Sequence, residues 1–500
     1  MKKLNVYRSA AQVSIFSAVE KSLSFIYRII LSRFIGAEGI GIYQICLSVF
    51  AVFLTAASSG IPVTVSRLMA KETATGSERG KHAAVSAGVL CTLLFTVPAA
   101  VIIFFGRNLL SFLFPDRACL NIFILLLPGL ILTSVYAVMR GSFWGNKQFL
   151  PYSVIELAED AVMVVFGIIF IQFSSTATEG AFFATLAVLI SYVFSFFVSI
   201  GWYIFKGGKF VDPRPQLKPL LASSLPITAM RTSTSLINSL VSLFLPALLM
   251  AACGYTNSEA LALYGAVLGM SIPILYTPNA FIGSISVVIA PEMSENFYAR
   301  RQEKLRADVE KTLKASVFIA TVLIPVFFTL GEDLGIFLYS NAFAGQVIQR
   351  FSFIMLPMCI SIITTTILNS MNYEVKTLIH FFIGSIFMLA CIFTLTPILG
   401  INSYMVGLSL DYFITAALNL RILKKNCEGV NYFKYTVQSA LICAVACLFG
   451  WLTDRLFAFL PLIARIAVCG VLIAAFSVGI FYAFEMFTFN PLKKLLARKR

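Results

Sequence analysis

Long apolar runs separated by short polar segments follow one another along the whole chain. A run of about 20 apolar residues is the length that crosses a bilayer as an α-helix. The expected fold class is therefore an all-α integral membrane protein with about 14 transmembrane helices. The predicted spans are residues 10–35, 40–65, 83–105, 119–140, 152–173, 181–205, 221–252, 260–290, 314–331, 347–369, 377–398, 401–421, 433–453 and 461–486.

Composition supports the membrane class and excludes a soluble one. Of the 500 residues, 59% are hydrophobic and 12% are charged, whereas a soluble domain has about 25% charged residues. The net charge of +15 would suggest a nucleic-acid partner in a soluble protein. Here no basic stretch lies within a foldable soluble module, so no nucleic-acid partner is expected.

Basic residues gather in alternate loops, as they do on the cytoplasmic side of membrane proteins. The opposite loops hold Arg107, Arg117, Arg350, Arg455 and Arg465. The "MKK" start and the "PLKKLLARKR" end fall on the basic side. We therefore expect a multi-pass plasma-membrane protein with an even number of spans and both termini in the cytoplasm. The basic loops contain Arg67, Lys71, Arg79, Lys81, Arg140, Lys147, Lys206, Lys209, Arg214, Lys218, Arg300, Arg301, Lys304, Arg306, Lys311, Lys314, Lys376, Arg421, Lys424, Lys425 and Lys434.

No cofactor or metal site is expected. Most of the ten cysteines lie inside apolar runs, without a C-x-x-C motif, and are interpreted as small core residues. His82 and His380 are the two histidines, too few for a histidine-based metal site. The N-terminal segment "MKKLNVYRSAAQVSIF" is followed by a stretch too long and too charged for a signal peptide, so we interpret it as a retained first span.

An internal repeat divides the chain. "LPGLILTSVYAVMRGSFWGNKQFLP", which begins at Leu127, aligns without a gap with "LPMCISIITTTILNSMNYEVKTLIH", which begins at Leu356. Parallel repeats in transporters place the substrate between two halves that alternate in access. The predicted domains are an N-lobe at 1–205 (helices 1–6), a cytoplasmic linker at 206–219, a C-lobe at 220–425 (helices 7–12), and helices 13–14 with a basic cytoplasmic tail at 426–500.

Three stretches resemble one family of transporters: "RIILSRFIGAEGIGIYQ", "SSGIPVTVSRLMAKETATG" and "VMRGSFWGNKQFLPYSVIE". They resemble the stage V sporulation protein B group of polysaccharide transporters. That group belongs to the multidrug/oligosaccharidyl-lipid/polysaccharide exporter superfamily and is related to the lipid II flippases of peptidoglycan synthesis. The resemblance implies two six-helix lobes around a central cavity, with two extra helices lining a groove for a lipid tail. It also implies export of a lipid-linked cell-wall precursor.

The first span contains four charged residues, although a charge at the bilayer centre costs at least ~2.5–3.5 kcal/mol. Lys21 and Arg28 are seven residues apart and share a helix face. Arg33 lies near the outer end and is expected to be an interfacial anchor. Arg28 either pairs with a carboxylate of another helix or lines a cavity that receives substrate pyrophosphate, for which arginine is well suited. Glu20 is expected to be a partner of a neighbouring charge.

Arg231 is the second candidate, in the unusually polar stretch "ITAMRTSTSLINS" of the seventh span. That span is the repeat counterpart of the first. The resemblance to lipid II flippases implies basic residues on helix one and on the cavity walls. Lys21, Arg28 and Arg231 are therefore the candidates for binding the substrate head group.

Carboxylates in other spans provide the negative charge that could balance these cations. "VIELAEDAV" places Glu156, Glu159 and Asp160 in one stripe of the fifth span. They either pair with loop lysines near the cytoplasmic face, pair with the cations of the first span, or bind a coupling H⁺ or Na⁺ together with Glu20. Asp411 in "LSLDYFITAALN" either binds a coupling cation or makes a polar contact with Arg231 or Asn419.

Three classes of membrane protein predict different arrangements of charged residues and loops. A flippase for a lipid-linked, pyrophosphate-bearing precursor predicts basic residues facing the cavity, with lipid-linked oligosaccharide, membrane lipids and cell-wall synthesis enzymes as partners. A cation-coupled multidrug exporter of the same superfamily predicts an acidic, aromatic cavity instead. A membrane glycosyltransferase or polymerase would need a large extramembrane loop with catalytic carboxylates. No loop here is that long, so we expect a transporter and not an enzyme.

Overall fold

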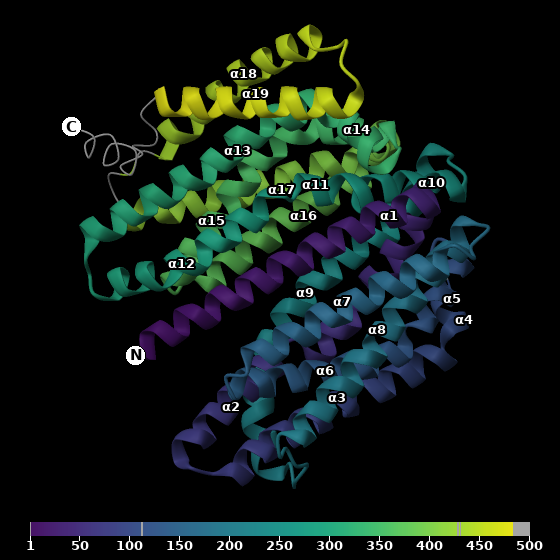
Figure 1. Cartoon of the computed structure of the whole chain (residues 1–500), viewed down its shortest axis with the longest axis vertical. Helices are drawn as coiled ribbons and strands as arrows, with labels where there is room; N and C mark the ends of the chain where they lie inside the picture. The colour runs from purple at the N-terminus through teal and green to yellow at the C-terminus, as the bar shows by residue number, and fades with distance from the viewer. Residues whose placement is uncertain (1, 112–113, 428–429, 431, 484–500) are drawn as a thin grey trace. The chain divides into compact units, whose positions relative to one another are not determined.

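The computed structural model describes residues 2–111, 114–427, 430 and 432–483. Within these residues all regular structure is helical. The last part of the predicted span 461–486 and the basic tail lie outside them. The chain forms two compact units, Met1–Gly265 and Ala266–Arg500, hereafter unit 1 and unit 2, and each is described by itself (Figure 1).

Unit 1 contains the helices α1 to α10. Their bounds are α1 Lys2–Ser58, α2 Ile61–Thr75, α3 Glu78–Phe105, α4 Arg107–Leu110, α5 Arg117–Leu125, α6 Leu127–Gly145, α7 Phe149–Ile171, α8 Ala177–Phe205, α9 Arg214–Cys253 and α10 Asn257–Tyr264.

Unit 2 contains the remaining elements, beginning with a π-helix. Their bounds are η2 Gly265–Ser271, α11 Ile272–Leu275, α12 Pro278–Tyr298, α13 Gln302–Tyr339, α14 Ala342–Phe351, η3 Ser352–Ile354, α15 Met355–Ser370, α16 Glu374–Leu399, α17 Asn402–Asn426, α18 Tyr432–Leu456 and α19 Leu462–Ala483.

The described residues hold 11 helices long and apolar enough to cross a membrane, or 12 if the bent pair α5 and α6 is one span. Fourteen spans stay a prediction. One candidate, Ile15–Thr75, is 61 residues long and covers two expected spans. As one straight helix at ~1.5 Å per residue it would be about 90 Å long, roughly three times the apolar thickness of a bilayer. α7, with its three carboxylates, is not among the 11.

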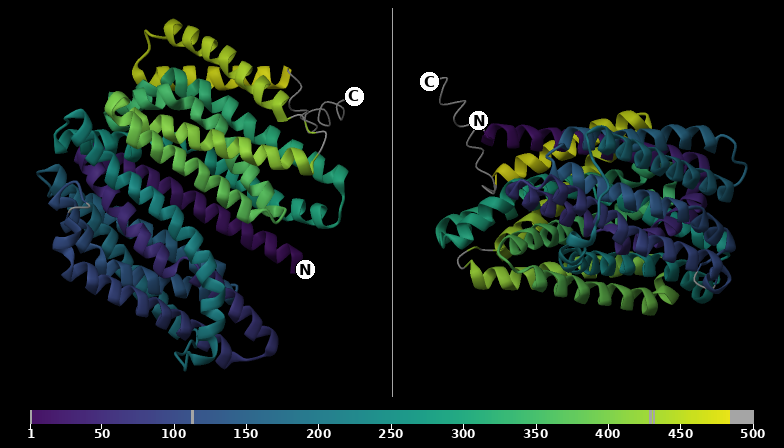
Figure 2. Two further views of the ribbon diagram at one scale, coloured as in Figure 1. Left: turned by 180° about the vertical axis from the view of Figure 1, so that it is seen from behind. Right: turned by 90° about the horizontal axis from the view of Figure 1, so that it is seen from below.

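A glycine interrupts the long helix α1. Gly36 has φ 67° and ψ −175°, outside the helical region, in a conformation that favours glycine. Figures 1 and 2 show α1 folding back on itself. The chain thus turns at Gly36, while the rest of the stretch "GAEGIG", in which a turn is expected from its glycines, is helical.

Beyond this turn, α1 and α10 touch through their backbones. A Cβ atom on Gly41 would lie 2.2 Å from the carbonyl oxygen of Leu261, and one on Gly265 would lie 1.9 Å from that of Ala37. Only glycine fits at these two positions, so the helices approach more closely here than any side chain would allow.

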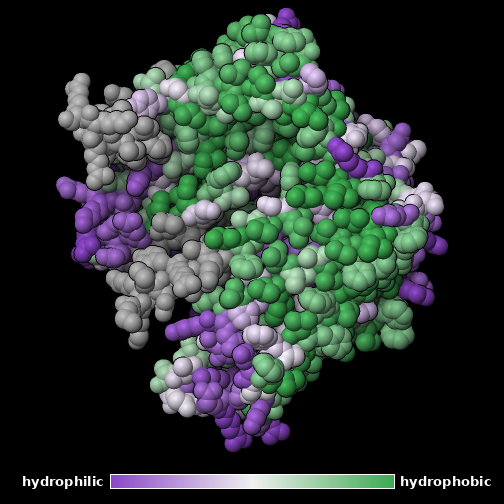
Figure 3. Space-filling view, viewed as in Figure 1, coloured by the Kyte–Doolittle hydropathy of each residue, from purple (hydrophilic) through white to green (hydrophobic). Residues whose placement is uncertain are grey.

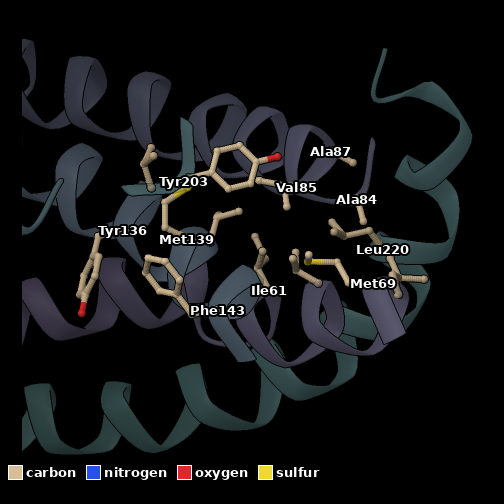
Figure 4. Packing of buried hydrophobic residues seen from close by; sticks show 14 of the residues in the cluster. Ile61, Met69, Ala84, Val85, Ala87, Tyr136, Met139, Phe143, Tyr203 and Leu220 are labelled. Carbon is tan, nitrogen blue, oxygen red and sulfur yellow. The ribbon is translucent and has the colours of Figure 1, made fainter. Parts of the chain in front are cut away.

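The core of unit 1 joins the beginning of α9 to the earlier helices (Figure 4). Leu220 of α9 is completely buried. It belongs to one apolar cluster with residues of α2, α3, α6, α7 and α8, among them Ile61, Met69, Met139 and Tyr203. Gln216, on the first turn of α9, donates from Nε2 to Oε1 of Glu72 at 3.0 Å. The seventh predicted span is therefore packed within unit 1.

The segment that leads into α9, residues 206–213 (the strap), is docked on α3 and α8. The hydroxyl of Tyr203 donates to the carbonyl of Lys209 at 3.1 Å, and His82 Nδ1 lies 3.1 Å from the same hydroxyl. The N–H of Val211 donates to Oγ of Ser86 at 2.9 Å. These hydrogen bonds hold the first part of the predicted linker against α3 and α8. The chain passes from unit 1 to unit 2 at Gly265. The division into lobes at 206–219 stays a prediction.

Polar residues collect at the ends of the helices. In Figure 3 apolar side chains cover the helix flanks, and hydrophilic side chains gather where helices meet their loops. This distribution is what a bilayer requires, because lipid tails contact the flanks and water contacts the ends.

The docked strap gives a testable prediction. Replacing Ser86 by Ala removes the acceptor of the Val211 N–H, a bond worth ~1 kcal/mol. Cleavage of a segment that opens locally follows the population of its open form. We expect trypsin to cut the purified protein at Lys206 and Lys209 about fivefold faster in Ser86→Ala. The control is Thr394→Ala, whose hydroxyl donates within its own helix. An unchanged rate in Ser86→Ala would contradict docking of the strap.

Candidate functional site

The cationic stripe of α1 faces the carboxylates of α7. Ser24 lies between Lys21 and Arg28 on the same face of α1, since three and four residues approximate one helical turn. Its hydroxyl donates to Oδ2 of Asp160 at 3.2 Å. α1 packs against α7 and α8 within unit 1. The bond therefore places the level of α1 that contains Lys21 and Arg28 beside the acidic stripe.

Glu20 joins that acidic stripe. It is half-buried and interacts electrostatically with Glu156, Asp160, Lys21 and Arg140. Glu159 lies deeper, next to Ser195 of α8. Four carboxylates from two helices therefore share one region of unit 1.

Arg140 of α6 is the cation that sequence reasoning missed. Its Nη1 donates to Oε1 of Glu156 at 3.2 Å, with 33% and 18% of the two side chains exposed. Its guanidinium carbon lies 5.7 Å from the centre of the Trp144 ring. Glu156 is thus paired with an arginine of a neighbouring helix and not with a loop lysine. Because Arg140 ends an apolar run, the sequence pattern places it in a basic loop. The spacing of four between Tyr136, Arg140 and Trp144 nevertheless puts all three on one helix face.

Several polar atoms in this region are buried without a hydrogen-bond partner among the described residues. The hydroxyls of Tyr27 and Tyr136 and the Nε of Arg140 are buried without a hydrogen bond in the part of the chain that the structure describes. Both tyrosines are 4% exposed. Buried polar atoms of this kind usually bind water or a ligand.

The other cations of the first span differ in depth. Arg28 is half-buried, while Lys21 and Arg33 are exposed. Arg28 interacts electrostatically with Tyr43, and so does Asp160. Arg28 and Asp160 therefore both lie within electrostatic range of the same tyrosine. The exposure of Arg33 fits an interfacial anchor.

Arg231 lies on α9, and the hydrogen bond from its guanidinium goes to the backbone and not to a carboxylate of the acidic stripe. It is exposed, and its Nη1 donates to the carbonyl oxygen of Ser59 at 3.0 Å. Ser59 lies between α1 and α2, where the helix is interrupted. The structure thus gives Arg231 a backbone partner within unit 1.

Asp411 belongs to unit 2 and is 7% exposed. The hydroxyl of Thr415, one turn further along α17, donates to its Oδ1 at 3.5 Å. A Cβ on Gly384 of α16 would lie 2.0 Å from the same oxygen, so glycine makes the space for this carboxylate. Asn419 has other partners: its Nδ2 donates to Thr365 Oγ1 at 2.9 Å.

The described residues contain no group of three or more histidine, cysteine, aspartate or glutamate side chains arranged to hold a metal ion. The described side chains of this region of unit 1 offer charged groups of both signs. Cations on α1 and α6 lie beside carboxylates on α1 and α7, an arrangement that can exchange partners with an ionic ligand or take up a small cation.

Comparison with known proteins identifies relatives over most of the chain. The sequence model described as "Polysaccharide biosynthesis protein" matches residues 7–297. The chain is 22% identical to Stage V sporulation protein B of Bacillus subtilis over 447 residues, 85% of each chain. It is 18% identical to Lipid II flippase MurJ of the same organism over 520 aligned positions, 96% of this chain and 95% of that one. These matches confirm the family resemblance stated from the motifs.

Solved structures show the same fold. The inward closed conformation of Lipid II flippase MurJ superimposes with a TM-score of 0.71 at 15% identity, covering 95% of this chain and all of that chain. An inward-facing multidrug resistance MATE family transporter of the MOP superfamily superimposes with a TM-score of 0.69 at 15% identity, covering 82% and 95%.

The pair of Arg140 and Glu156 gives a stability prediction. Arg140→Gln leaves a largely buried carboxylate without its partner, which we expect to cost about 1–3 kcal/mol, less than a fully buried pair because Arg140 is partly exposed. The double variant Arg140→Gln/Glu156→Gln removes both charges and should recover most of the loss. Thermal unfolding in detergent measures the three variants. If the double variant is as unstable as the sum of the single ones, the two side chains do not form a pair.

Proposed function

We propose that this chain, a member of the polysaccharide biosynthesis protein family, is a flippase. It moves a lipid-linked, pyrophosphate-bearing cell-wall or polysaccharide precursor from the cytoplasmic to the outer leaflet by alternating access. The relatives whose names state a function are transporters, so this chain is classed as a transporter and not as an enzyme. The name of the lipid II flippase that aligns with almost the whole chain supports a lipid-linked substrate.

The main support is the hydrogen bond from Ser24 to Asp160. It sets the stripe of Lys21 and Arg28 against the carboxylates of α7. Without substrate, these carboxylates act as internal counter-ions for the cations of α1, which lowers the cost of keeping charges within the membrane. The stripe can therefore stay charged and ready to receive an anionic head group.

A pyrophosphate would compete for these cations. Each of its phosphorus atoms bears an ionised oxygen, and arginine donates to such oxygens in a planar fork while lysine acts as a point charge. In our proposal Lys21 and Arg28 bind the head group directly. Arg231 is the third cation of the head-group site, provided by α9.

Substrate binding also leaves the carboxylates with excess negative charge. Glu20, Glu156, Glu159 and Asp160 then face only Arg140 as a fixed partner. Two like charges ~5 Å apart repel by about 3 kcal/mol at an effective dielectric constant of ~20. Uptake of a coupling H⁺ or Na⁺ removes this repulsion. Head-group binding and ion uptake in unit 1 are thereby linked, and Asp411 is a second candidate for the coupling ion in unit 2.

In the proposed topology the chain has fourteen spans, a parallel repeat of six helices, and both termini in the cytoplasm. The turn at Gly36 supports the first pair of spans, since it divides a helix long enough for two crossings. Cell-wall synthesis enzymes are the proposed partners on the membrane, because they make and consume such precursors.

A cation-coupled multidrug exporter is the second candidate. The likeness to the MATE family transporter supports it at the level of fold, and the acidic stripe suits a cationic drug. The cations Lys21 and Arg28 beside that stripe would repel such a drug, which favours the flippase.

The proposal predicts the effect of Arg28→Ala in liposomes that contain the purified protein. A hydrogen bond to a charged group contributes ~1.5–3 kcal/mol, so the flipping rate of a polyprenyl-pyrophosphate sugar should fall at least about tenfold. Arg33→Ala, an exposed arginine of the same helix, should keep the wild-type rate. Equal rates for Arg28→Ala and wild type would exclude Arg28 as a head-group ligand. Efflux of a cationic drug without flipping would favour the exporter.

A further inference from the structure

The chain is not continuously helical between α1 and α2. α1 ends at Ser58 and α2 begins at Ile61, which leaves Ser59 and Gly60 between them. Pro62 explains the break, because it has no N–H and its ring collides with the carbonyl four residues earlier. The break lies inside the predicted span 40–65, so its backbone groups need partners from the protein.

α9 provides those partners. The N–H of Gly60 donates to Oγ1 of Thr228 at 3.1 Å, and Arg231 donates to the carbonyl of Ser59 at 3.0 Å. Thr228 and Arg231 are three residues apart and therefore share a face of α9. One face of one helix thus satisfies a donor and an acceptor of the break.

The fit at Gly60 is close. A Cβ on Gly60 would lie 2.4 Å from the carbonyl oxygen of Ser224 and 2.6 Å from Oγ1 of Thr228. The backbone of the break therefore rests directly on α9. Since Ser224 and Thr228 are one turn apart, this contact fixes α9 along its axis, and the position of Arg231 follows from it.

Two hydroxyls of residues that make or adjoin the Arg231 contact in sequence, Oγ of Ser59 and Oγ1 of Thr232, are buried without a hydrogen bond in the described part of the chain. A hydroxyl can donate, so both are candidate additional donors to an anion that binds Arg231.

We propose that Gly60 and Thr228 are positioning residues for Arg231, and that the Ser59 carbonyl is the resting partner that Arg231 leaves when it binds the substrate head group. An ionised phosphate oxygen is a stronger acceptor than a neutral carbonyl. Release of the Ser59 carbonyl then removes one of the contacts that hold the break. Head-group binding would in this way loosen the junction of α1 and α2. The proposal rests on the proposed flippase function.

Thr228→Val and Thr228→Ser form a matched pair for the test. Valine keeps the shape but removes the acceptor of the Gly60 N–H, whereas serine keeps the hydroxyl. In the liposome assay we expect Thr228→Val to raise the KM for the polyprenyl-pyrophosphate sugar about fivefold with little change in Vmax. Thr228→Ser should behave as wild type.

Arg231→Gln provides the second arm. If Thr228 acts through Arg231, adding Thr228→Val to Arg231→Gln should not raise the KM further. Additive effects, or a KM unchanged in Thr228→Val, would overturn the positioning role. A merely structural effect would lower the amount of folded protein without this dependence on Arg231.

Amide hydrogen exchange separates this proposal from the proposed function. We expect the peptide around Gly60 to exchange faster in Thr228→Val than in Thr228→Ser, whatever the substrate is. If the wild-type protein flips no pyrophosphate lipid but this exchange difference is present, the flippase proposal fails while the docking of the break stands. If exchange is the same in both variants, the docking itself is wrong.

Discussion

Peptide groups inside a bilayer have no water to bind, so every interruption of a spanning helix needs partners from the protein. The structure meets this constraint repeatedly. At the break before Ile61 the partners come from α9. In the π-helix η2, Oγ of Ser271 donates to the carbonyls of Ala266 and Ala344. The helices that provide such partners are held in register, and the side chains between these contacts acquire fixed positions.

Buried charge is subject to the same constraint. Lys21 of α1 and Arg140 of α6 interact electrostatically with Glu20, and the bond from Ser24 to Asp160 fixes the level of α1 against the carboxylates of α7. Glu156 is paired with Arg140. In our proposal the other carboxylates and the cations of α1 change partners during transport, which a purely structural ion pair does not do.

Sequence patterns predict the helices well where one apolar run is one helix, as for α3 and α8. The grouping of Glu156, Glu159 and Asp160 also follows from spacing alone. Arg140 could not be found in this way, because its role depends on a contact between neighbouring helices that periodicity does not encode. The bond of Arg231 to a backbone carbonyl is hidden for the same reason. The docking of residues 206–213 arises from His82, Ser86 and Tyr203, three polar residues scattered in apolar helices with no local signal.

The proposed mechanism requires that the cations of α1 bind a pyrophosphate. It can be tested by measuring the binding of a short polyprenyl pyrophosphate and of the corresponding polyprenyl alcohol to the purified protein, at low and high salt. The pyrophosphate should bind more tightly, salt should weaken this preference because the contacts are ionic, and Lys21→Ala/Arg28→Ala should abolish it. Equal binding of the two lipids, or a preference that persists in the double variant, would show that these cations do not bind the pyrophosphate.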